Sequence, residues 1–192
     1  MCSSDLTENQ PSFQAMADGK IDVVLEDWDN TLVASNAKYL KSGAVKNVGG
    51  NGITGVIGWF IPRYLLKDHP EFATWKGLKG KESVFKSAEA PEGMFLGGDP
   101  SYVQKDRLLI KGLGLAFKHV VAGAEPAQVA RWSQLYKLKK PVIFYWYDPQ
   151  YLNAQFDLVQ VKLPARFKGC QDRKSTRLNS SHVSESRMPS SA

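Results

Sequence analysis

The chain has 192 residues and a mass of 21.3 kDa, which suits one domain of ordinary size or two small lobes that share a fold. Apolar residues make up 43% and charged residues 23% of the sequence, so the chain can build a core and is not a disordered polymer. The net charge is +6, but the basic residues are scattered and do not alternate with aromatic residues as in a nucleic-acid groove. We therefore expect no nucleic-acid partner.

Two further classes of protein are excluded by the pattern of apolar residues and cysteines. The longest apolar run, Val142 to Tyr147, is much too short to span a bilayer. The two cysteines, Cys2 and Cys170, cannot supply a four-ligand zinc site or a disulfide scaffold. The chain is therefore expected to contain no membrane span and no structural zinc site.

The two ends of the chain differ in composition from the rest. Residues 172–192 have almost no large apolar side chains and many serines, which is typical of a disordered tail. Within them, DRKSTRLNSSH resembles a translated sequencing adapter, and so does the opening MCSSDL. We expect 1–6 and 172–192 to be non-native and the natural segment to run from Thr7 to Gln171. On that basis the missing signal peptide says nothing about the compartment.

Strand-like and helix-like segments alternate along the chain. The apolar and β-branched runs predict strands at 21–25, 56–61, 93–96, 118–121, 142–146 and 158–161. Capping residues, prolines and glycines predict helices at 31–41, from Pro62, at 99–115, at 126–139 and at 149–154. Loops are expected at 47–55 and 76–91. This alternation predicts an α/β layered architecture with mainly parallel strands.

One short motif indicates an enzyme. The residues from Asp27 to Leu32 follow an apolar strand and resemble the D-x-D-x-T-L pattern of the haloacid dehalogenase-like phosphohydrolases. By that resemblance Asp27 is the nucleophile and Asp29 the acid/base, with both helping to hold magnesium. The family also needs a later acidic pair, and Asp99 and Asp106 do not form a convincing one. The phosphohydrolase is kept as the alternative function.

Other catalytic and cofactor patterns are weak. The glycine-rich segment 50–55 precedes a predicted strand, whereas a dinucleotide fingerprint follows one. His69 and His119 stand apart from any serine elbow, and Cys170 is more plausible as a half-cystine than as a nucleophile. We expect no catalytic residue, no cofactor and no metal.

Aromatic residues at the ends of predicted strands carry the strongest signal. Trp28, Tyr102 and Trp146 each lie just beyond a strand or at the start of the following helix. Ligands bind at this carboxyl edge in parallel α/β sheets. Because aromatic faces attract cations, most usefully those without N–H groups, the three residues predict a pocket for a trimethylammonium group.

Four segments together resemble the substrate-binding proteins of glycine betaine/choline (quaternary amine) ABC transporters, over essentially all of Thr7 to Gln171. The matching segments are Gly19 to Val23 with Trp28 after it, Gly58 to Pro62, Gly98 to Tyr102, and Lys140 to Trp146 with its continuation to Leu158.

The resemblance implies a two-lobed periplasmic-binding-protein fold of type II, truncated at both ends. Lobe I would comprise 7–61 and a return segment at 150–171, and lobe II would comprise 62–149. The ligand would be held between the lobes in an aromatic box of Trp28, Tyr102 and Trp146.

The resemblance also implies a polar anchor for the ligand carboxylate, which we assign to Gln150. Some members have His at the position of Gln150 and Trp at that of Tyr151, so the choice between betaine, choline and carnitine stays open. The implied function is that of an extracytoplasmic solute receptor, not an enzyme. Its partners would be the ligand and an ABC transporter permease, with membrane contact only through the permease or a lipid anchor outside the fragment. A regulatory ligand-binding module of similar fold would bind the same ligands.

Overall fold

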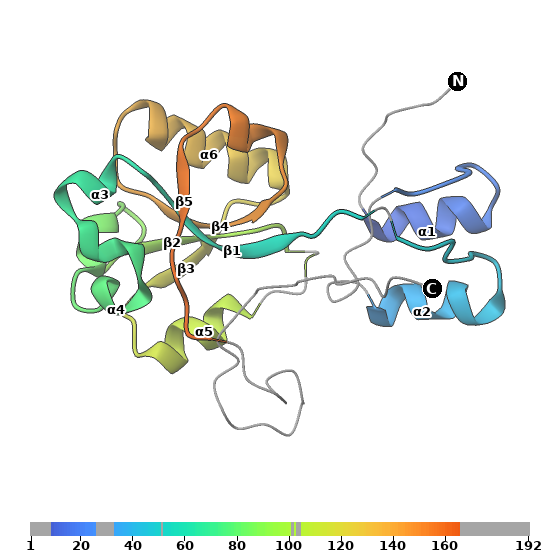
Figure 1. Cartoon of the computed structure of the whole chain (residues 1–192). Helices are drawn as coiled ribbons and strands as arrows, with labels where there is room; N and C mark the ends of the chain where they lie inside the picture. The colour runs from blue at the N-terminus through green and yellow to red at the C-terminus, as the bar shows by residue number, and fades with distance from the viewer. Residues whose placement is uncertain (1–8, 26–32, 51, 101, 103–104, 166–192) are drawn as a thin grey trace. The chain divides into compact units, whose positions relative to one another are not determined.

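The computed structural model describes residues 9–25, 33–50, 52–100, 102 and 105–165 (Figure 1). The chain divides into two compact units. The first unit comprises Met1–Thr54 with Ser184–Ala192, and the second unit comprises Gly55–Val183. The two segments expected to be non-native, 1–6 and 172–192, lie outside the described residues.

The first unit contains two helices, α1 (Asn9–Ala17) and α2 (Val33–Ser42). They pack through Phe13 and Tyr39, whose ring centroids are 6.2 Å apart, and the Tyr39 hydroxyl donates to Gln14 Oε1 at 2.7 Å. Helix α2 confirms the predicted helix, and Gly43 follows it with a φ of 75° that suits glycine.

The predicted strand at 21–25 is wrong. These residues form no strand, and Val23 and Leu25 are 54% and 78% exposed. A strand is stable only beside a second strand that takes up its backbone hydrogen bonds, and within the described parts of the chain no strand pairs with this segment.

The second unit is built on a five-stranded sheet in the order β3-β2-β4-β1-β5 (Figure 1). Its strands are β1 (Val56–Pro62), β2 (Met94–Gly97), β3 (Lys118–Val121), β4 (Ile143–Asp148) and β5 (Leu158–Gln160). Strand β2 runs parallel to β3 and β4, whereas β1 runs antiparallel to β4 and β5. The five predicted strands of this unit are confirmed, but the sheet is mixed and not mainly parallel.

Seven short or medium helical segments accompany the sheet in the described part of the second unit. They are α3 (Leu65–Asp68), η1 (Pro70–Ala73), α4 (Trp75–Leu78), η2 (Glu82–Phe85), α5 (Asp106–Leu113), α6 (Glu125–Lys137) and η3 (Tyr151–Ala154). Helix α6 confirms the helix predicted at Pro126. The segment predicted as a loop at 76–91 contains helical turns, because α4 and η2 fall within or across it.

Two predicted helix starts are wrong. Pro62 is the last residue of β1 and pairs with Leu158 of β5, so the next helix begins only at Leu65. Asp99 does not begin a helix, because its carboxylate accepts a hydrogen bond from the backbone N–H of Glu125 at 3.2 Å, and α5 begins at Asp106. Both residues contact segments that are distant in sequence, Pro62 through strand pairing and Asp99 through its side chain, and a local sequence pattern does not contain such contacts.

The core of the second unit lies on both faces of the sheet, with α6 on one side and α5 on the other (Figure 1). On one face Trp132 of α6 stacks on Phe144 with centroids 4.9 Å apart and planes 7° apart. On the other face Trp59 packs against Phe95 at 4.8 Å, and its indole N–H donates to Asp106 of α5. Burial of these aromatic side chains supplies much of the hydrophobic stabilisation.

The lobe boundaries expected near Ile61 and Pro149 stay a prediction. Strand β1 runs through Ile61 without interruption, and the boundary between the two compact units falls at Thr54 and Gly55.

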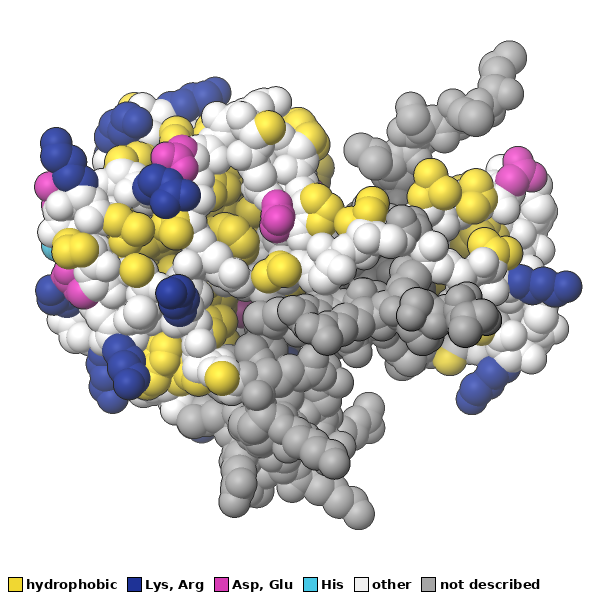
Figure 2. All heavy atoms as spheres, viewed as in Figure 1, with side chains coloured by type: hydrophobic (Ala, Val, Ile, Leu, Met, Phe, Trp, Pro, Cys, Tyr) yellow, Lys and Arg dark blue, Asp and Glu magenta, His cyan; other side chains and the backbone are white. Residues whose placement is uncertain are grey.

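In the part of the chain that is described, no helix is long and apolar enough to cross a membrane. Figure 2 shows the Lys and Arg side chains of the second unit spread around the visible face and not gathered in one patch.

Candidate ligand-binding site

The candidate site lies at the carboxyl edge of the parallel part of the sheet. Strands β3, β2 and β4 run in the same direction, so their carboxyl ends meet at one edge. The chain leaves β2 at Gly97 and passes through Asp99 to Tyr102, and it leaves β3 at Val121 to enter α6 at Glu125. This edge is where ligands bind in open α/β sheets.

The carboxylate of Glu125 joins two tyrosines from different segments. Tyr102 donates its hydroxyl to Glu125 Oε2 at 2.8 Å, and Tyr147 donates to Oε1 and Oε2 at 2.9 and 3.0 Å. The amide of Gln150 lies 3.5 Å from Oε1, at the limit of a hydrogen bond. We call Tyr102, Glu125, Tyr147 and Gln150 the tyrosine–carboxylate cluster.

Asp99 ties the loop after β2 to the start of α6. Its side chain is 6% exposed and accepts from the Glu125 N–H at 3.2 Å. Its backbone carbonyl accepts from the Tyr102 N–H at 3.0 Å. Two residues of the cluster are therefore positioned through one buried aspartate.

A third tyrosine, Tyr145, lies behind the cluster. Its ring is 6.2 Å from that of Tyr102 at an angle of 40°, and its backbone carbonyl accepts from Gln128 Nε2 at 2.6 Å. Burial, and then the charge of Glu125, raise the pKa of Tyr102 above its ordinary value. Burial, and then the charge of Asp106, do the same for the pKa of Tyr145. Both phenols therefore stay neutral, and that of Tyr102 donates its hydrogen bond to Glu125.

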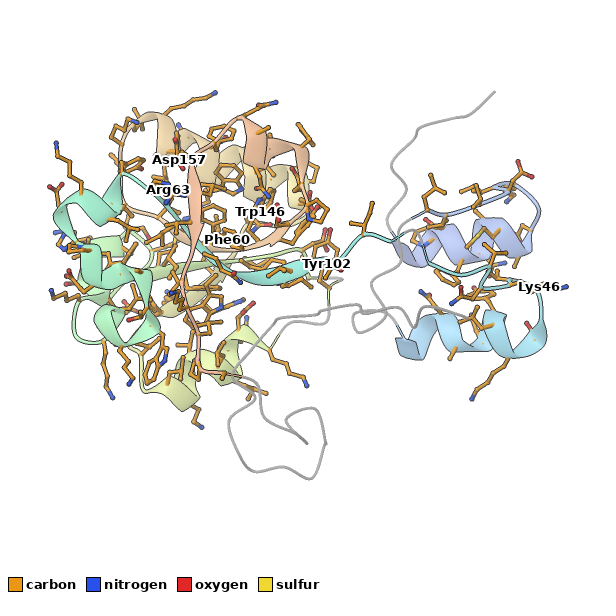
Figure 3. The ribbon with its side chains drawn as sticks, in the orientation of Figure 1. Lys46, Phe60, Arg63, Tyr102, Trp146 and Asp157 are labelled. Atoms are coloured by element: carbon orange, nitrogen blue, oxygen red, sulfur yellow. The ribbon has the colours of Figure 1, made fainter. Side chains whose placement is uncertain are left out.

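Trp146 lies in the core and not on the surface of the cluster. Its side chain is 0% exposed, it packs edge-on against Trp132 at 5.2 Å, and its indole N–H donates to Asn153 at 2.8 Å. Figure 3 shows Trp146 within the body of the second unit and Tyr102 at its edge. Alternate residues of β4 face opposite sides of the sheet, and the place predicted for Trp146 in an aromatic box stays a prediction.

The side chain of Gln150 caps a helical turn and also belongs to the tyrosine–carboxylate cluster. Its side-chain oxygen accepts from the Leu152 N–H at 2.7 Å and so caps η3, while its amide points toward Glu125. Of the predicted site residues, the structure thus brings together Tyr102 and Gln150. Trp28 lies outside the described residues, as do Asp27 and Asp29 of the alternative phosphohydrolase site.

The sequence analysis missed Glu125 and Tyr147 as site residues. Tyr147 belongs to the aromatic run of β4, where nothing distinguishes it from its neighbours in sequence. Glu125 is the acidic residue in the first turn of α6, a common helix-stabilising position. Helix α6 follows a parallel strand, so its first residue is expected at the carboxyl edge of the sheet. This is the one sequence signal that could have predicted Glu125 as a site residue.

A pocket of about 260 Å³ opens beyond the end of β4. It is lined by Val56, Phe60, Asp148, Asn153, Phe156, Leu158 and Gln160. Asn153 connects it to the cluster, because its amide donates to the Tyr147 carbonyl at 3.2 Å and to Asp148 Oδ1 at 2.8 Å. Among the residues that the structure describes, no three His, Cys, Asp or Glu side chains form a group that could hold a metal ion.

Comparison with protein families identifies the family of the chain. The family described as the substrate binding domain of ABC-type glycine betaine transport systems matches residues 4–183. The chain belongs to this family. The glycine betaine-binding family comprises transport substrate-binding domains and not enzymes, in agreement with the sequence analysis.

Three solved structures resemble the chain. The glycine betaine, L-proline ABC transporter binding protein ProX of Borrelia burgdorferi is 20% identical with a TM-score of 0.58, over 81% of this chain and 56% of that one. A choline-binding protein of an ABC transporter in complex with choline is also 20% identical, with a TM-score of 0.56, over 80% and 52%. Lactococcal OpuAC in its closed conformation with glycine betaine is 16% identical, with a TM-score of 0.57, over 92% and 62%.

These similarities show the fold. They confirm the predicted α/β periplasmic-binding-protein fold of type II, of which this chain spans between half and two thirds of the length of the matched structures. The matches give no support to the phosphohydrolase, because each protein matched is a transport binding protein.

Proposed function

We propose that the chain binds glycine betaine, choline or a related quaternary amine as the receptor of an ABC importer. The cation would rest against the rings of Tyr102 and Tyr147, beside the carboxylate to which both hydroxyls donate. The observation that carries this proposal is the convergence of two tyrosines on Glu125 at the ligand-binding edge of the sheet.

The chemistry of the cluster suits a methylated ammonium ion. Such a cation has no N–H to donate, so a site needs aromatic faces and nearby negative charge in place of hydrogen-bond acceptors. Tyr102 and Tyr147 supply faces that are partly buried, and Glu125 supplies the carboxylate to which both hydroxyls donate. The carboxylate of Asp99 adds a second acidic group, which accepts from the backbone N–H of Glu125. Cation–π contacts at such desolvated faces are worth about 2 kcal/mol or more.

The other predicted site residues take different parts in this proposal. Trp146 supports Tyr147 from the core, where the two rings lie 5.1 Å apart at 33°. Gln150 is proposed as the polar group nearest the carboxylate or hydroxyl end of the ligand. Trp28 is proposed as a further aromatic face on the strength of the sequence resemblance alone.

The wider role follows from the family. A two-lobed receptor closes on its ligand because the closed form binds it more tightly, and the closed form is what a permease recognises. We propose that this chain acts outside the cytoplasmic membrane and delivers its ligand to an ABC permease. No bond of the ligand is made or broken.

Isothermal titration calorimetry tests the proposal directly. The protein is titrated with choline, glycine betaine and carnitine, and with the neutral tert-butyl analogue of choline, in which carbon replaces the quaternary nitrogen. At least one of the three cations should bind, and choline should bind about tenfold or more tightly than its neutral analogue, since cation–π attraction needs the charge. Absence of binding to all three cations, or equal affinity for choline and its analogue, contradicts the proposal.

A further inference from the structure

We propose that Glu125 is a positioning residue that acts through Tyr102 and Tyr147 and makes their rings select a cation over a neutral group of the same shape. This inference rests on the proposed function, because it concerns the ligand of the same site. It assigns to the carboxylate a role that is exerted through the two rings whose hydroxyls it accepts from.

The hydrogen bonds fix the two rings relative to each other. Tyr102 comes from the loop after β2 and Tyr147 from the end of β4, and each hydroxyl donates to the same carboxylate at 2.8 to 3.0 Å. Hydrogen bonds from a phenol to a carboxylate are charge-assisted and about twice as strong as neutral ones. The carboxylate therefore holds the two rings in one arrangement before a ligand arrives.

The same hydrogen bonds change the rings electronically. A phenol that donates to a carboxylate shifts electron density from its O–H bond toward the ring, which strengthens the negative potential at the ring face. Burial of Tyr102 keeps water from replacing this partner, and the raised pKa of Tyr102 reflects both burial and the neighbouring charge. A cation gains from this polarisation and a neutral ligand does not.

The backbone of Glu125 is fixed at the start of helix α6. Its own N–H donates to the buried Asp99 at 3.2 Å, and it lies in the first turn of α6, where the helix dipole favours an acidic group. A residue with only this helix-stabilising role would affect stability and would affect all ligands equally. The experiment must therefore measure the difference between a cationic and a neutral ligand.

The test compares Glu125→Gln with the matched control Glu92→Gln by titration with choline and its neutral tert-butyl analogue. Glu92 is exposed and precedes β2, at the opposite end of that strand from the cluster, so its substitution removes the same charge elsewhere. Glu125→Gln should weaken choline binding about fivefold or more while changing the affinity for the analogue less than about twofold. Glu92→Gln should leave both affinities within about twofold of wild type.

A double-mutant cycle with Tyr147→Phe tests whether Glu125 acts through the tyrosine. In the wild-type background Tyr147→Phe should lower choline affinity about threefold, and in the Glu125→Gln background it should add almost nothing. Should Glu125→Gln fail to fold, Tyr147→Phe alone must still lower the affinity for choline and leave that for the analogue unchanged.

The outcomes separate the two proposals. If wild-type protein binds no quaternary amine, the proposed function is overturned and this inference with it. If wild-type protein binds choline but Glu125→Gln weakens choline and the analogue equally, or weakens neither, only the role of Glu125 is overturned. The role of Glu125 is also overturned if Tyr147→Phe lowers the affinity for choline equally in the wild-type and Glu125→Gln backgrounds.

Discussion

The indole N–H of Trp59 donates a hydrogen bond of 2.8 Å to the carboxylate of Asp106 in the interior of the second unit. Trp59 belongs to β1 and is 0% exposed, and Asp106 begins α5 and is 1% exposed. This hydrogen bond joins strand β1 of the sheet to helix α5, which packs on one face of the sheet. A buried carboxylate that loses such a donor keeps the cost of its desolvation.

We predict that Trp59→Phe lowers the free energy of unfolding by about 2–3 kcal/mol, because it removes the donor and leaves part of the indole volume empty. Chemical denaturation measures this difference. Trp75→Phe is the matched control, since Trp75 is only partly buried, and it should cost less than about 1 kcal/mol. Equal losses for the two variants contradict the importance of the bond to Asp106.

The backbone at Gly93 permits a second prediction about stability. Gly93 has a φ of 135°, and a Cβ placed there would lie 2.3 Å from the Glu82 carbonyl oxygen. Gly93→Ala should therefore cost on the order of 3 kcal/mol, from backbone strain and a collision that cannot relax easily.

Gly80→Ala is the control for that variant. Gly80 also has a positive φ, of 79°, but a Cβ there meets nothing within 4 Å. It should cost about 1 kcal/mol from strain alone. Thermal and chemical unfolding measure both variants, and a Gly93→Ala protein as stable as Gly80→Ala would show that the loop before β2 moves aside.

His119 makes stability depend on pH. Burial lowers the pKa of its imidazole, the charge of Asp106 acts in the opposite direction, and the charge of Arg107 lowers the pKa further. Between the lowered folded-state pKa and the ordinary value of 6.5, the unfolded chain binds more protons at this residue than the folded one. The stabilisation is complete above the unfolded pKa and is lost as the pH falls through the folded one.

Unfolding free energies of wild type and His119→Asn should therefore diverge in their pH dependence. Between about pH 7.5 and pH 5.5 the wild type should lose more stability than the variant, because only the wild type must protonate a half-buried imidazole on acidification. His69 is present in both proteins and cancels in the comparison. Parallel pH profiles would contradict the effect of burial on His119.

The strands of the second unit were predictable because their signal is local. The run from Val142 to Tyr147 is apolar over a strand's length, and the predicted strand at 142–146 agrees with β4 within two residues at each end. The run from Ile21 to Leu25 has a similar pattern but forms no strand, because pairing depends on a neighbour that the pattern does not contain.

The candidate site was predictable only in part, for a related reason. Tyr102 and Gln150 lie in the cluster and Trp146 lies in the core, and the ligand-binding role that the sequence resemblance implied for all three stays a prediction. In an apolar strand such as β4 both faces look alike in sequence, so alternation cannot say which of its aromatic rings meets a ligand. Glu125 was missed because its partners come from two other segments, and only the position of α6 after a parallel strand pointed to it.

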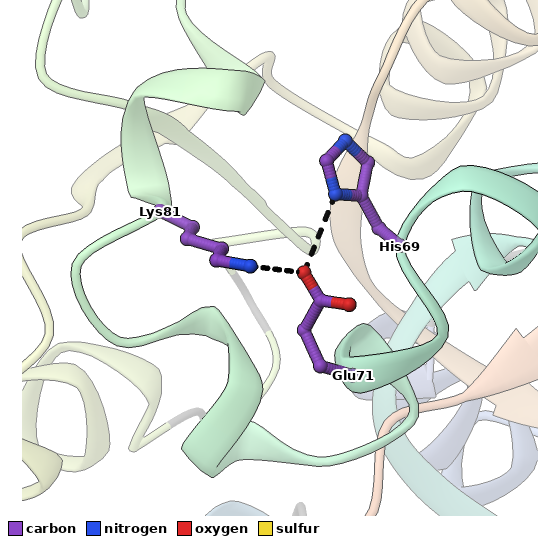
Figure 4. A network of polar contacts seen from close by, with 3 residues as sticks. All are labelled: His69, Glu71 and Lys81. Atoms are coloured by element: carbon purple, nitrogen blue, oxygen red, sulfur yellow. Dashed lines mark hydrogen bonds and ion pairs between the residues drawn. The ribbon is translucent and has the colours of Figure 1, made fainter.

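Glu71, Lys81 and His69 form a polar network on the surface of the second unit (Figure 4). Lys81 donates to Glu71 Oε1, and His69 Nδ1 lies 3.3 Å from the same oxygen. The hydrogen bond from Lys81 is the largest cause that lowers the pKa of Glu71 to about 2.

We predict that Lys81→Met moves the pKa of Glu71 upward toward its ordinary value of 4.5. Titration of the Glu71 side-chain carboxyl carbon by NMR measures the change. Lys79→Met removes the same charge from the same loop and should leave the pKa of Glu71 near its wild-type value. A wild-type pKa near 4.5 would show that the contact with Lys81 does not persist in solution.

The last prediction concerns the hydroxyl and the ring of Tyr102 separately. Tyr102→Phe keeps the ring but removes the donor to Glu125, so choline affinity should fall about threefold to tenfold. Tyr102→Ala removes the ring as well, and the affinity should fall further, by about thirtyfold or more, since a cation–π contact is lost. Tyr64→Phe is the control, because its hydroxyl donates to the Lys140 carbonyl before β4 begins, at the other end of that strand. Calorimetric titration should show unchanged binding for this control, and an equally small effect of Tyr102→Phe and Tyr102→Ala would mean that the cation does not rest on this ring.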